Sequence, residues 1–160
     1  MNKQLLEKYA RLAVVTGVNV QKDQLVVLRT TTEAVELTRE VARQAYIAGA
    51  KRVHIIWQDE RVSRYGYEFA QTENLKEVPQ FTVDQYKYFV EQGACFISIV
   101  SPIPNVLAGV DAKKMQEVAV AAMKPIQFFR EHTMGNTTQW TIVAASNESW
   151  ATKLFPELET

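Results

Sequence analysis

The chain alternates between short runs of apolar residues and longer segments in which apolar residues recur at helical spacing. The apolar runs predict strands buried on both faces of a sheet, and they are residues 25–28, 52–57, 94–100 and 140–145. The helical spacing predicts helices, and the segments that show it are residues 3–15, 33–48, 83–92, 111–131 and 148–155. Residues 63–70 also fit a helix, although Gly66 and an alternating set of aromatic residues weaken the pattern there.

Residues with special backbone preferences mark the predicted ends of these elements. Gly17 and Gly49 follow two of the helical segments, as C-terminal glycines commonly do. Asp111 stands where an N-cap residue belongs, and Pro125 is expected to kink or divide the long helix after it. Two prolines make residues 101–105 a stiff loop after the third strand, because proline fixes φ and donates no backbone hydrogen bond.

The order of these elements predicts an α/β fold. Residues 25–57 form a strand, a helix and a strand, which implies two parallel strands joined by a right-handed crossover. Continued alternation of apolar strands and helices indicates a three-layer sandwich with a mostly parallel, Rossmann-like or flavodoxin-like sheet. A length of 160 residues fits one domain.

The last residues predict a strand and a helix that open a further unit. Trp140–Ala145 has the pattern of a strand, Ser146 and Asn147 offer an N-cap, and Pro156 ends the short helix that follows. From this pattern we expect residues 1–160 to be a single α/β domain, the N-terminal fragment of a longer two-domain protein.

Composition and charge narrow the class of protein. Lys plus Arg and Asp plus Glu are equal at 18 each, which argues against nucleic acid or an anionic membrane surface as a partner. No apolar run approaches the length of about 18 residues that spans a bilayer, and the acidic, amphipathic start does not resemble a signal peptide. A single cysteine, Cys95, fits a reducing cytoplasm.

Polar loops follow all four predicted strands, at the edge of a parallel sheet where ligands usually bind. These loops are residues 29–33, 58–61, 101–105 and 146–149. Thr30, Thr31 and Thr32 can bind an anion through hydroxyls and backbone N–H groups at a helix start. An ordinary N-cap loop explains them better, because no glycine there lets the backbone approach a phosphate.

The residues that usually carry chemistry have structural explanations. Asp59 and Glu60 suit a metal or a general base, but helix capping explains them equally well. His54 and His132 belong to no zinc-binding spacing. Cys95 fits an inert core thiol, and Ser101 lacks the motif of a serine nucleophile. We therefore predict no catalytic, cofactor-binding or metal-binding residue within the chain.

The aromatic residues are placed mostly at core spacing, and an exposed subset would mark a partner surface. The ones considered are Trp57, Tyr86, Tyr88, Phe128, Trp140 and Trp150.

Two stretches of the chain resemble a known family. Residues 33–60 are similar to the helix and second strand of the first βαβ unit of the thermophilic-type metalloaminopeptidases, the aminopeptidase T and aminopeptidase S group. Residues 140–156 resemble the strand, loop and helix that precede the second domain of that family. Leu5, Tyr9 and Ala10 fit its opening helix, and Gly17 and Val18 fit the segment that follows that helix. The resemblance covers essentially the whole chain and is strongest to the aminopeptidase S branch of Gram-positive bacteria.

This resemblance implies a cytoplasmic, dimeric hydrolase that removes N-terminal residues from peptides with two divalent metal ions, cobalt, zinc or magnesium. In that family the metal ligands belong to the C-terminal domain, so no ligand position can be matched in this chain. The resemblance thus implies a domain that is inactive alone, frames the substrate cavity and supports the dimer. Two alternatives stay open: a nucleotide- or anion-binding module that uses Thr30–Thr32, and a protein-interaction domain with an exposed patch at residues 65–69 and Trp150.

Overall fold

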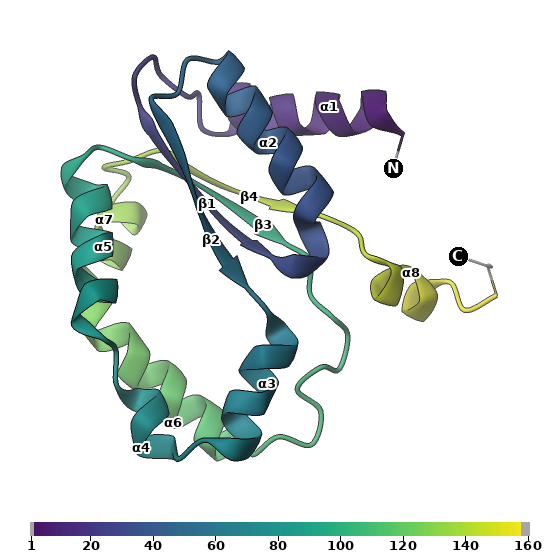
Figure 1. The fold of residues 1–160 in the computed structure, drawn as a ribbon, viewed down its shortest axis with the longest axis vertical. Coiled ribbons are helices and arrows are strands. Elements are labelled where there is room, and N and C mark those ends of the chain that lie inside the picture. The colour runs from purple at the N-terminus through teal and green to yellow at the C-terminus, as the bar shows by residue number, and fades with distance from the viewer. Residues whose placement is uncertain (1, 158–160) are drawn as a thin grey trace.

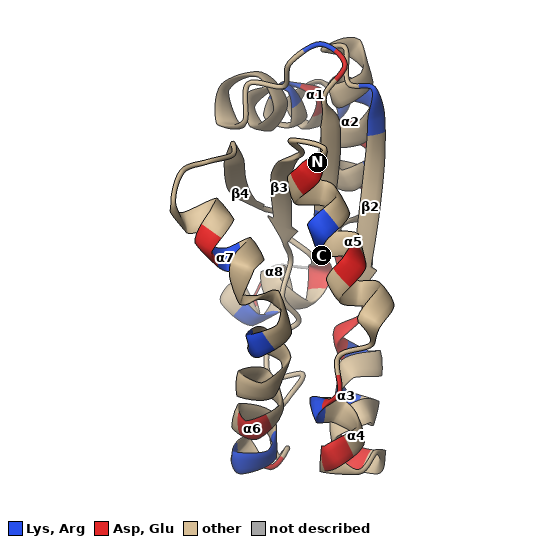
Figure 2. Cartoon of the chain, turned by 90° about the vertical axis from the view of Figure 1, so that its left-hand side faces the viewer, with Lys and Arg blue, Asp and Glu red and all other residues tan. Residues whose placement is uncertain are grey.

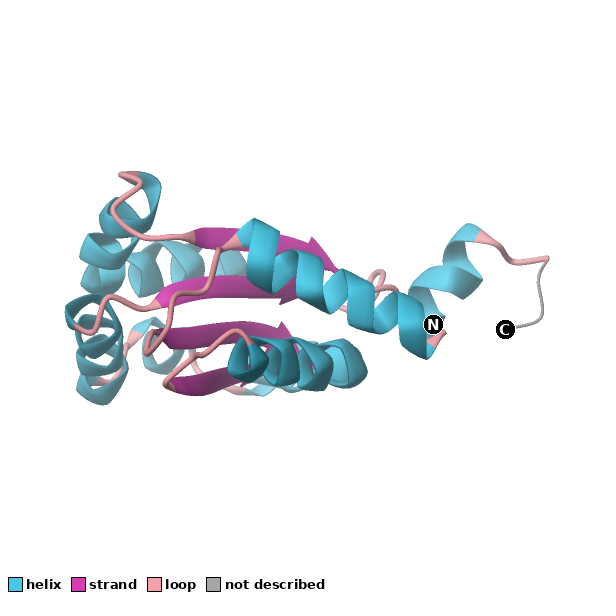
Figure 3. Cartoon of the chain, turned by 90° about the horizontal axis from the view of Figure 1, so that it is seen from above, coloured by secondary structure: helices cyan, strands magenta, loops and turns pink. Residues whose placement is uncertain are grey.

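The computed structural model describes residues 2–157, and its centre is a four-stranded sheet (Figure 1). The strands are β1 (Leu25–Thr31), β2 (Arg52–Gln58), β3 (Cys95–Val100) and β4 (Trp140–Ala144). Their order is β2-β1-β3-β4 and every pair is parallel, so the four arrows in Figure 3 point the same way. The α/β class is confirmed, and the order matches the first four strands of the flavodoxin-like arrangement.

Helices connect and cover these strands. Within the described residues they are α1 (Lys3–Arg11), α2 (Val35–Ile47), α3 (Glu60–Phe69), α4 (Thr72–Lys76), α5 (Gln80–Glu91), α6 (Ala112–Met123), α7 (Gln127–Met134) and α8 (Glu148–Leu154). Short helical turns of other types occupy Leu12–Gly17, Thr32–Ala34 and Lys124–Ile126. No helix in this part of the chain is both long enough and apolar enough to cross a membrane.

The two faces of the sheet carry separate hydrophobic clusters, because successive strand residues point to opposite sides. On one face, Val26 and Leu28 of β1 pack against α1 and α2. On the other face, Leu25 and Val27 pack against Phe89 of α5 and against α7. Helices on both faces of the sheet complete the three predicted layers.

The helices beyond the sheet are joined by polar contacts between segments far apart in sequence. Figures 1 and 2 show α3, α4 and α6 projecting past the carboxyl ends of the strands. The Lys114 ammonium donates to the carbonyl oxygens of Tyr67 and Ala70, each at 2.6 Å. The Arg64 guanidinium of α3 donates to the carbonyl oxygen of Val106 at 2.6 Å. This bond holds the segment between β3 and α6 against α3.

Most predicted boundaries are confirmed. Asp111 caps α6 by accepting from the N–H groups of Lys113 and Lys114. Pro125 lies in the turn that divides α6 from α7, and Gly49 has the positive φ of 98° expected after a helix.

Gly17 has a different role from the one predicted. It closes the wide turn after α1, while the nearby residue with positive φ is Asn19. A Cβ on Gly17 would lie 3.1 Å from the Thr141 side chain, so glycine permits the turn Leu12–Gly17 to approach β4 closely.

Two sequence predictions are wrong. Residues 29–31 are not a loop, because they continue β1 and pair with β2 up to the Thr31–Gln58 register. The aromatic residues Trp57, Trp140 and Tyr88 are not core residues, since they are 43%, 39% and 52% exposed. Trp57 and Trp140 lie on the two edge strands, which have a neighbour on one side only.

Candidate ligand site at the carboxyl edge of the sheet

A pocket of about 360 Å³ opens at the carboxyl edge of the sheet, where β1 and β3 lie side by side. From β1 the chain continues to β2 on one side, whereas from β3 it continues to β4 on the other side. The direction of winding therefore reverses between β1 and β3. Ligands of open α/β sheets bind at such a point. We call it the switch-point pocket. The polar or aromatic residues that line it are Arg29, Thr30, Thr31, Gln58, Glu60, Ser98, Ser101 and Trp150.

Two of the predicted acids are held in place by backbone groups. Asp59 caps α3, because its Oδ1 accepts from the N–H groups of Arg61 at 2.8 Å and Val62 at 3.1 Å. The Glu60 Oε2 accepts from the backbone N–H of Ile103 at 2.7 Å and so ties α3 to the proline loop. The capping explanation holds for Asp59, whereas Glu60 reaches the pocket.

Ser101 is fully buried and has a structural partner. The Asn147 Nδ2 group lies 3.0 Å from the Ser101 Oγ and within 3.2 Å of the carbonyl oxygens of Ser101 and Pro102. The Oδ1 of the same side chain accepts from the N–H of Trp150 and begins α8. Ser101 therefore joins two loops at the wall of the pocket, as expected of a residue without the surroundings of a nucleophile.

The three threonines that the sequence suggested as one anion cradle do not form one, although Thr30 and Thr31 both line the switch-point pocket. Thr30 points toward α2, where its hydroxyl lies 2.7 Å from that of Thr38. Thr31 faces the opposite side of β1 and lines the pocket. Its hydroxyl oxygen is buried and has no hydrogen-bond partner in residues 2–157.

Arg29 is the pocket residue that sequence reasoning missed. It lies in β1 beside Ser98 of β3, on the face that Leu25 and Val27 share further back. The helices α5 and α7 cover those apolar residues and leave the strand ends to the pocket. An arginine within an otherwise apolar strand was the available signal, but it was assigned to a loop.

Neither histidine approaches a metal-binding arrangement. The His54 ring packs 5.1 Å from that of Phe89 and contacts the Gln85 amide at 3.3 Å. The Nδ1 of His132 lies 2.8 Å from the Thr137 hydroxyl. Among residues 2–157, no three His, Cys, Asp or Glu side chains are grouped closely enough to hold a metal ion. These residues do not fit a two-metal centre, which needs several converging ligands.

Cys95 is a core thiol. Its side chain is fully buried at the start of β3, and this burial raises the pKa of the thiol to about 12. The reactive thiolate is therefore disfavoured at neutral pH.

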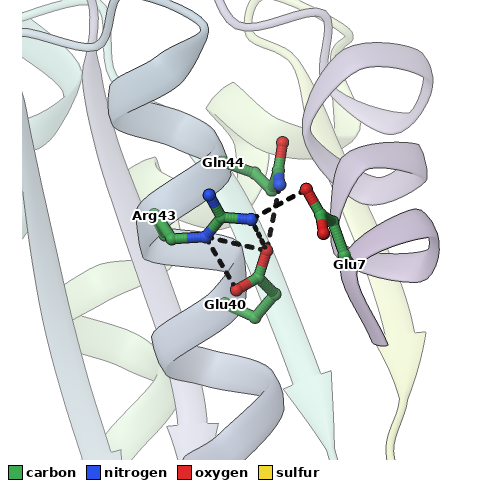
Figure 4. Close-up of polar contacts among 4 residues, drawn as sticks. All are labelled: Glu7, Glu40, Arg43 and Gln44. Carbon is green, nitrogen blue, oxygen red and sulfur yellow. Dashed lines mark hydrogen bonds and ion pairs between the residues drawn. The ribbon is translucent and has the colours of Figure 1, made fainter. Parts of the chain in front are cut away.

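One cluster of ion pairs lies away from the pocket, between α1 and α2 (Figure 4). The Arg43 guanidinium contacts Glu40 at 2.7 Å and Glu7 at 2.9 Å, and the Gln44 amide donates to Glu40 at 2.9 Å. The hydrogen bond from Arg43 is the main reason that the pKa of Glu40 is lowered. This cluster joins two helices and faces no pocket residue.

The chain has relatives among known aminopeptidases. It is 39% identical over 153 residues to aminopeptidase AmpS of Bacillus subtilis. The aligned region covers 96% of this chain and 37% of that protein. It is 34% identical to aminopeptidase 2 of Geobacillus stearothermophilus, with the same coverage. The solved structure of wild-type AmpT from Thermus thermophilus superimposes with a TM-score of 0.89 at 29% identity, over 99% of this chain and 40% of that chain.

The chain thus spans less than two-fifths of the length of the curated relatives described above. The sequence profile of one family, described as thermophilic metalloprotease (M29), matches residues 2–160. Since this match covers nearly every residue, the chain belongs to the thermophilic metalloprotease family M29.

Proposed function

We propose that this chain is the N-terminal domain of a metal-dependent aminopeptidase, a hydrolase that removes N-terminal residues from peptides. The observation that carries the proposal is the family match over residues 2–160, together with relatives that are named aminopeptidases. The partial coverage of those relatives supports a further, catalytic domain in the same protein. The equal numbers of acidic and basic residues and the lone cysteine support a cytoplasmic enzyme without nucleic-acid or membrane partners.

In this proposal the residues that bind metal belong to that further domain. The family description implies divalent metal, and we propose two ions, cobalt, zinc or magnesium. Such ions, when bound, polarise a carbonyl group and activate a water molecule. Three acids of the present chain have other roles, because Asp59 and Asp111 cap helices and Glu60 holds the proline loop.

The part that this domain plays would be structural. The carboxyl edge of its sheet and the projecting helices α3, α4 and α6 offer surfaces to frame a substrate cavity (Figure 2). Large apolar side chains on this extension are exposed, Phe69 by 81% and Tyr65 by 55%. Exposed apolar groups of this kind favour burial against a second domain or a second subunit.

The first test is an assay of the 160-residue chain on an aminoacyl-nitroanilide with added cobalt or zinc. We expect no turnover above a metal-only control. Turnover that a chelator abolishes would contradict the claim that the metal ligands lie elsewhere.

The second test is a chimera in which residues 2–157 replace the matching segment of aminopeptidase AmpS of Bacillus subtilis. Since the two segments are 39% identical, we expect a folded chimera that keeps metal-dependent peptide hydrolysis. A soluble, folded chimera without activity would contradict the proposed equivalence of the two segments.

A further inference from the structure

In the part of the chain that the structure describes, one face of the sheet is covered over only part of its length. Near the amino ends of the strands, Val27 and Phe96 pack against aromatic rings of α5 and α7. Toward the carboxyl ends, the segments that join these helices to the strands run into α3, α4 and α6, which project past the sheet (Figure 1). The carboxyl half of this face therefore lacks the cover that its amino half has.

Apolar residues in the carboxyl half of this face are exposed to solvent. Val100 of β3 is 42% exposed and Ile142 of β4 is 59% exposed. In contrast, Ile97 and Ile99 of β3 point to the other face and are at most 1% exposed. We call the exposed surface the uncovered sheet face, and its residues are Ser98, Val100, Ile142 and Ala144, which lie side by side across the β3–β4 pair.

This exposure is unusual for a parallel sheet. Parallel sheets are normally buried on both faces, because crossover helices lie on each side. The position of Val100 is not an edge effect, since β3 lies between β1 and β4. Exposed apolar residues that lie together on such a strand indicate a surface that another part of a protein covers.

The course of the chain after β4 indicates what covers this face. Helix α8 follows β4 and lies beyond the carboxyl ends of the strands (Figure 3). Its Trp150 lines the switch-point pocket together with Ser98 and Val100, so the chain passes beside the uncovered sheet face. The relatives are much longer, because the aligned region is 37% of AmpS and the superimposed region is 40% of AmpT. A domain tethered by a short linker has an effective concentration on the order of millimolar, which favours it over a second copy.

We propose that the uncovered sheet face is the docking surface for the further domain of the same protein, which contacts it through an apolar segment. This inference rests on the two-domain organisation in the proposed function and adds which face of the present domain makes the contact. Val100 and Ile142 supply the apolar area, and the small side chains of Ser98 and Ala144 let the segment approach the sheet closely.

The test compares the reactivity of one thiol in two proteins. Ile142→Cys is introduced into the 160-residue chain and into the chimera with AmpS of Bacillus subtilis, and mass spectrometry follows the labelling of that site by N-ethylmaleimide. The native Cys95 gives little background, since it is fully buried and its thiol pKa is raised to about 12. We expect labelling at least tenfold slower in the chimera than in the 160-residue chain.

The matched control is Ile47→Cys. Ile47 is 64% exposed, close to the 59% of Ile142, and it lies on α2, which packs on the opposite face of the sheet. Its thiol should react at the same rate in both proteins. Equal slowing at both positions would show a general loss of reactivity in the chimera and would overturn the proposal.

The outcomes separate this proposal from the proposed function. A chimera that hydrolyses peptides but leaves the Ile142→Cys thiol as reactive as in the 160-residue chain overturns the docking surface alone. A folded, inactive chimera with a protected thiol supports the docking surface and contradicts the equivalence of the two segments. Protection that appears in the 160-residue chain as its concentration rises would show that a second copy covers the face, and would overturn the proposal.

The natural relative provides a measurement that needs no chimera. A cysteine is placed in AmpS of Bacillus subtilis at the position aligned with Ile142, and a second at the position aligned with Ile47. We expect the first thiol to react at least tenfold more slowly than the second. Equal reactivity would overturn the proposal, so a chimera that fails to fold does not remove the test.

Discussion

Several polar side chains in this molecule form hydrogen bonds with polar side chains close to them. Thr38 and Thr30 satisfy each other inside the sheet–helix interface, and Glu40 collects hydrogen bonds from Arg43 and Gln44. The Thr31 hydroxyl differs, since it is buried and has no hydrogen-bond partner within residues 2–157. It is an exception, because buried polar groups normally have a hydrogen-bond partner.

The first prediction concerns acid stability at Glu40. The pKa of Glu40 is lowered in the folded chain, chiefly by the hydrogen bond from Arg43. A lowered folded-state pKa contributes stability above the unfolded-state pKa, and this contribution is lost as pH falls through the folded value. Glu40→Gln should therefore lower the unfolding midpoint in urea modestly at pH 7. The difference from wild type should shrink as pH falls below the unfolded-state pKa of about 4.3, and it should vanish once pH is below the lowered folded-state pKa.

The matched control for Glu40 is Glu73→Gln. Glu73 also contacts a cation, Lys76 at 2.9 Å, but its side chain is 80% exposed, whereas that of Glu40 is 16% exposed. We expect a smaller effect at Glu73, because water screens exposed pairs. Equal effects at both positions, or a Glu40 effect that persists in acid, would contradict the assignment.

Two side chains connect neighbouring elements, because each forms more than one hydrogen bond with backbone groups. Tyr9 of α1 donates its hydroxyl to the Ala144 carbonyl at 2.9 Å and accepts the Ala144 N–H at 3.1 Å, so it covers the open edge of β4. Asn147 does the same between α8 and the proline loop. The Asn147 contacts hold Ser101, Pro102 and Trp150, which line the switch-point pocket.

The second prediction concerns Asn147. Asn147→Ala removes the N-cap of α8 and the donor to Ser101 and Pro102, and it should lower the free energy of unfolding by about 1–2 kcal/mol. Asn147→Ser keeps a cap and loses only the donor, so its loss should be smaller. Urea denaturation measures both variants, and hydrogen exchange at the Trp150 amide reports the cap. Wild-type stability in Asn147→Ala would show that the connection has no energetic role.

At the scale of the whole molecule, the exposed extension beyond the sheet bears on assembly. Tyr65 and Phe69 lie together on α3, with ring centroids 6.4 Å apart and both side chains largely in solvent. Trp150, which the sequence grouped with them, is only partly exposed and belongs to the pocket wall. The aromatic surface is therefore narrower than the sequence suggested.

The third prediction is that the chain forms a concentration-dependent dimer. Light scattering should show a rising mass with concentration, and Phe69→Ser should shift the curve toward monomer without lowering thermal stability, because Phe69 is 81% exposed. Ile47→Ser, on α2 and 64% exposed, is the matched control and should leave the curve unchanged. A strict monomer, or equal effects of both substitutions, would contradict dimerisation through α3.

The sequence by itself determined most of the elements, the class of fold and the family, although it did not predict α4. Periodicity and capping are local, so Asp111, Pro125 and the apolar strand runs were sufficient to predict most boundaries. The same local view failed at residues 29–31, because polar residues extend a strand only when a neighbouring strand pairs with them, and β2 does so here. It also could not place Trp57 and Trp140 at the edges of the sheet.

Only the tertiary structure decided where the pocket lies and which residues line it. Arg29, Glu60, Ser98 and Trp150 come from separate parts of the chain, and the β1–β3 pairing and the loops tied by Asn147 bring them together. Strand order depends on packing between distant segments, which leaves no signal in the spacing of residues along one segment. The charges were visible in the sequence, and their convergence required the folded sheet.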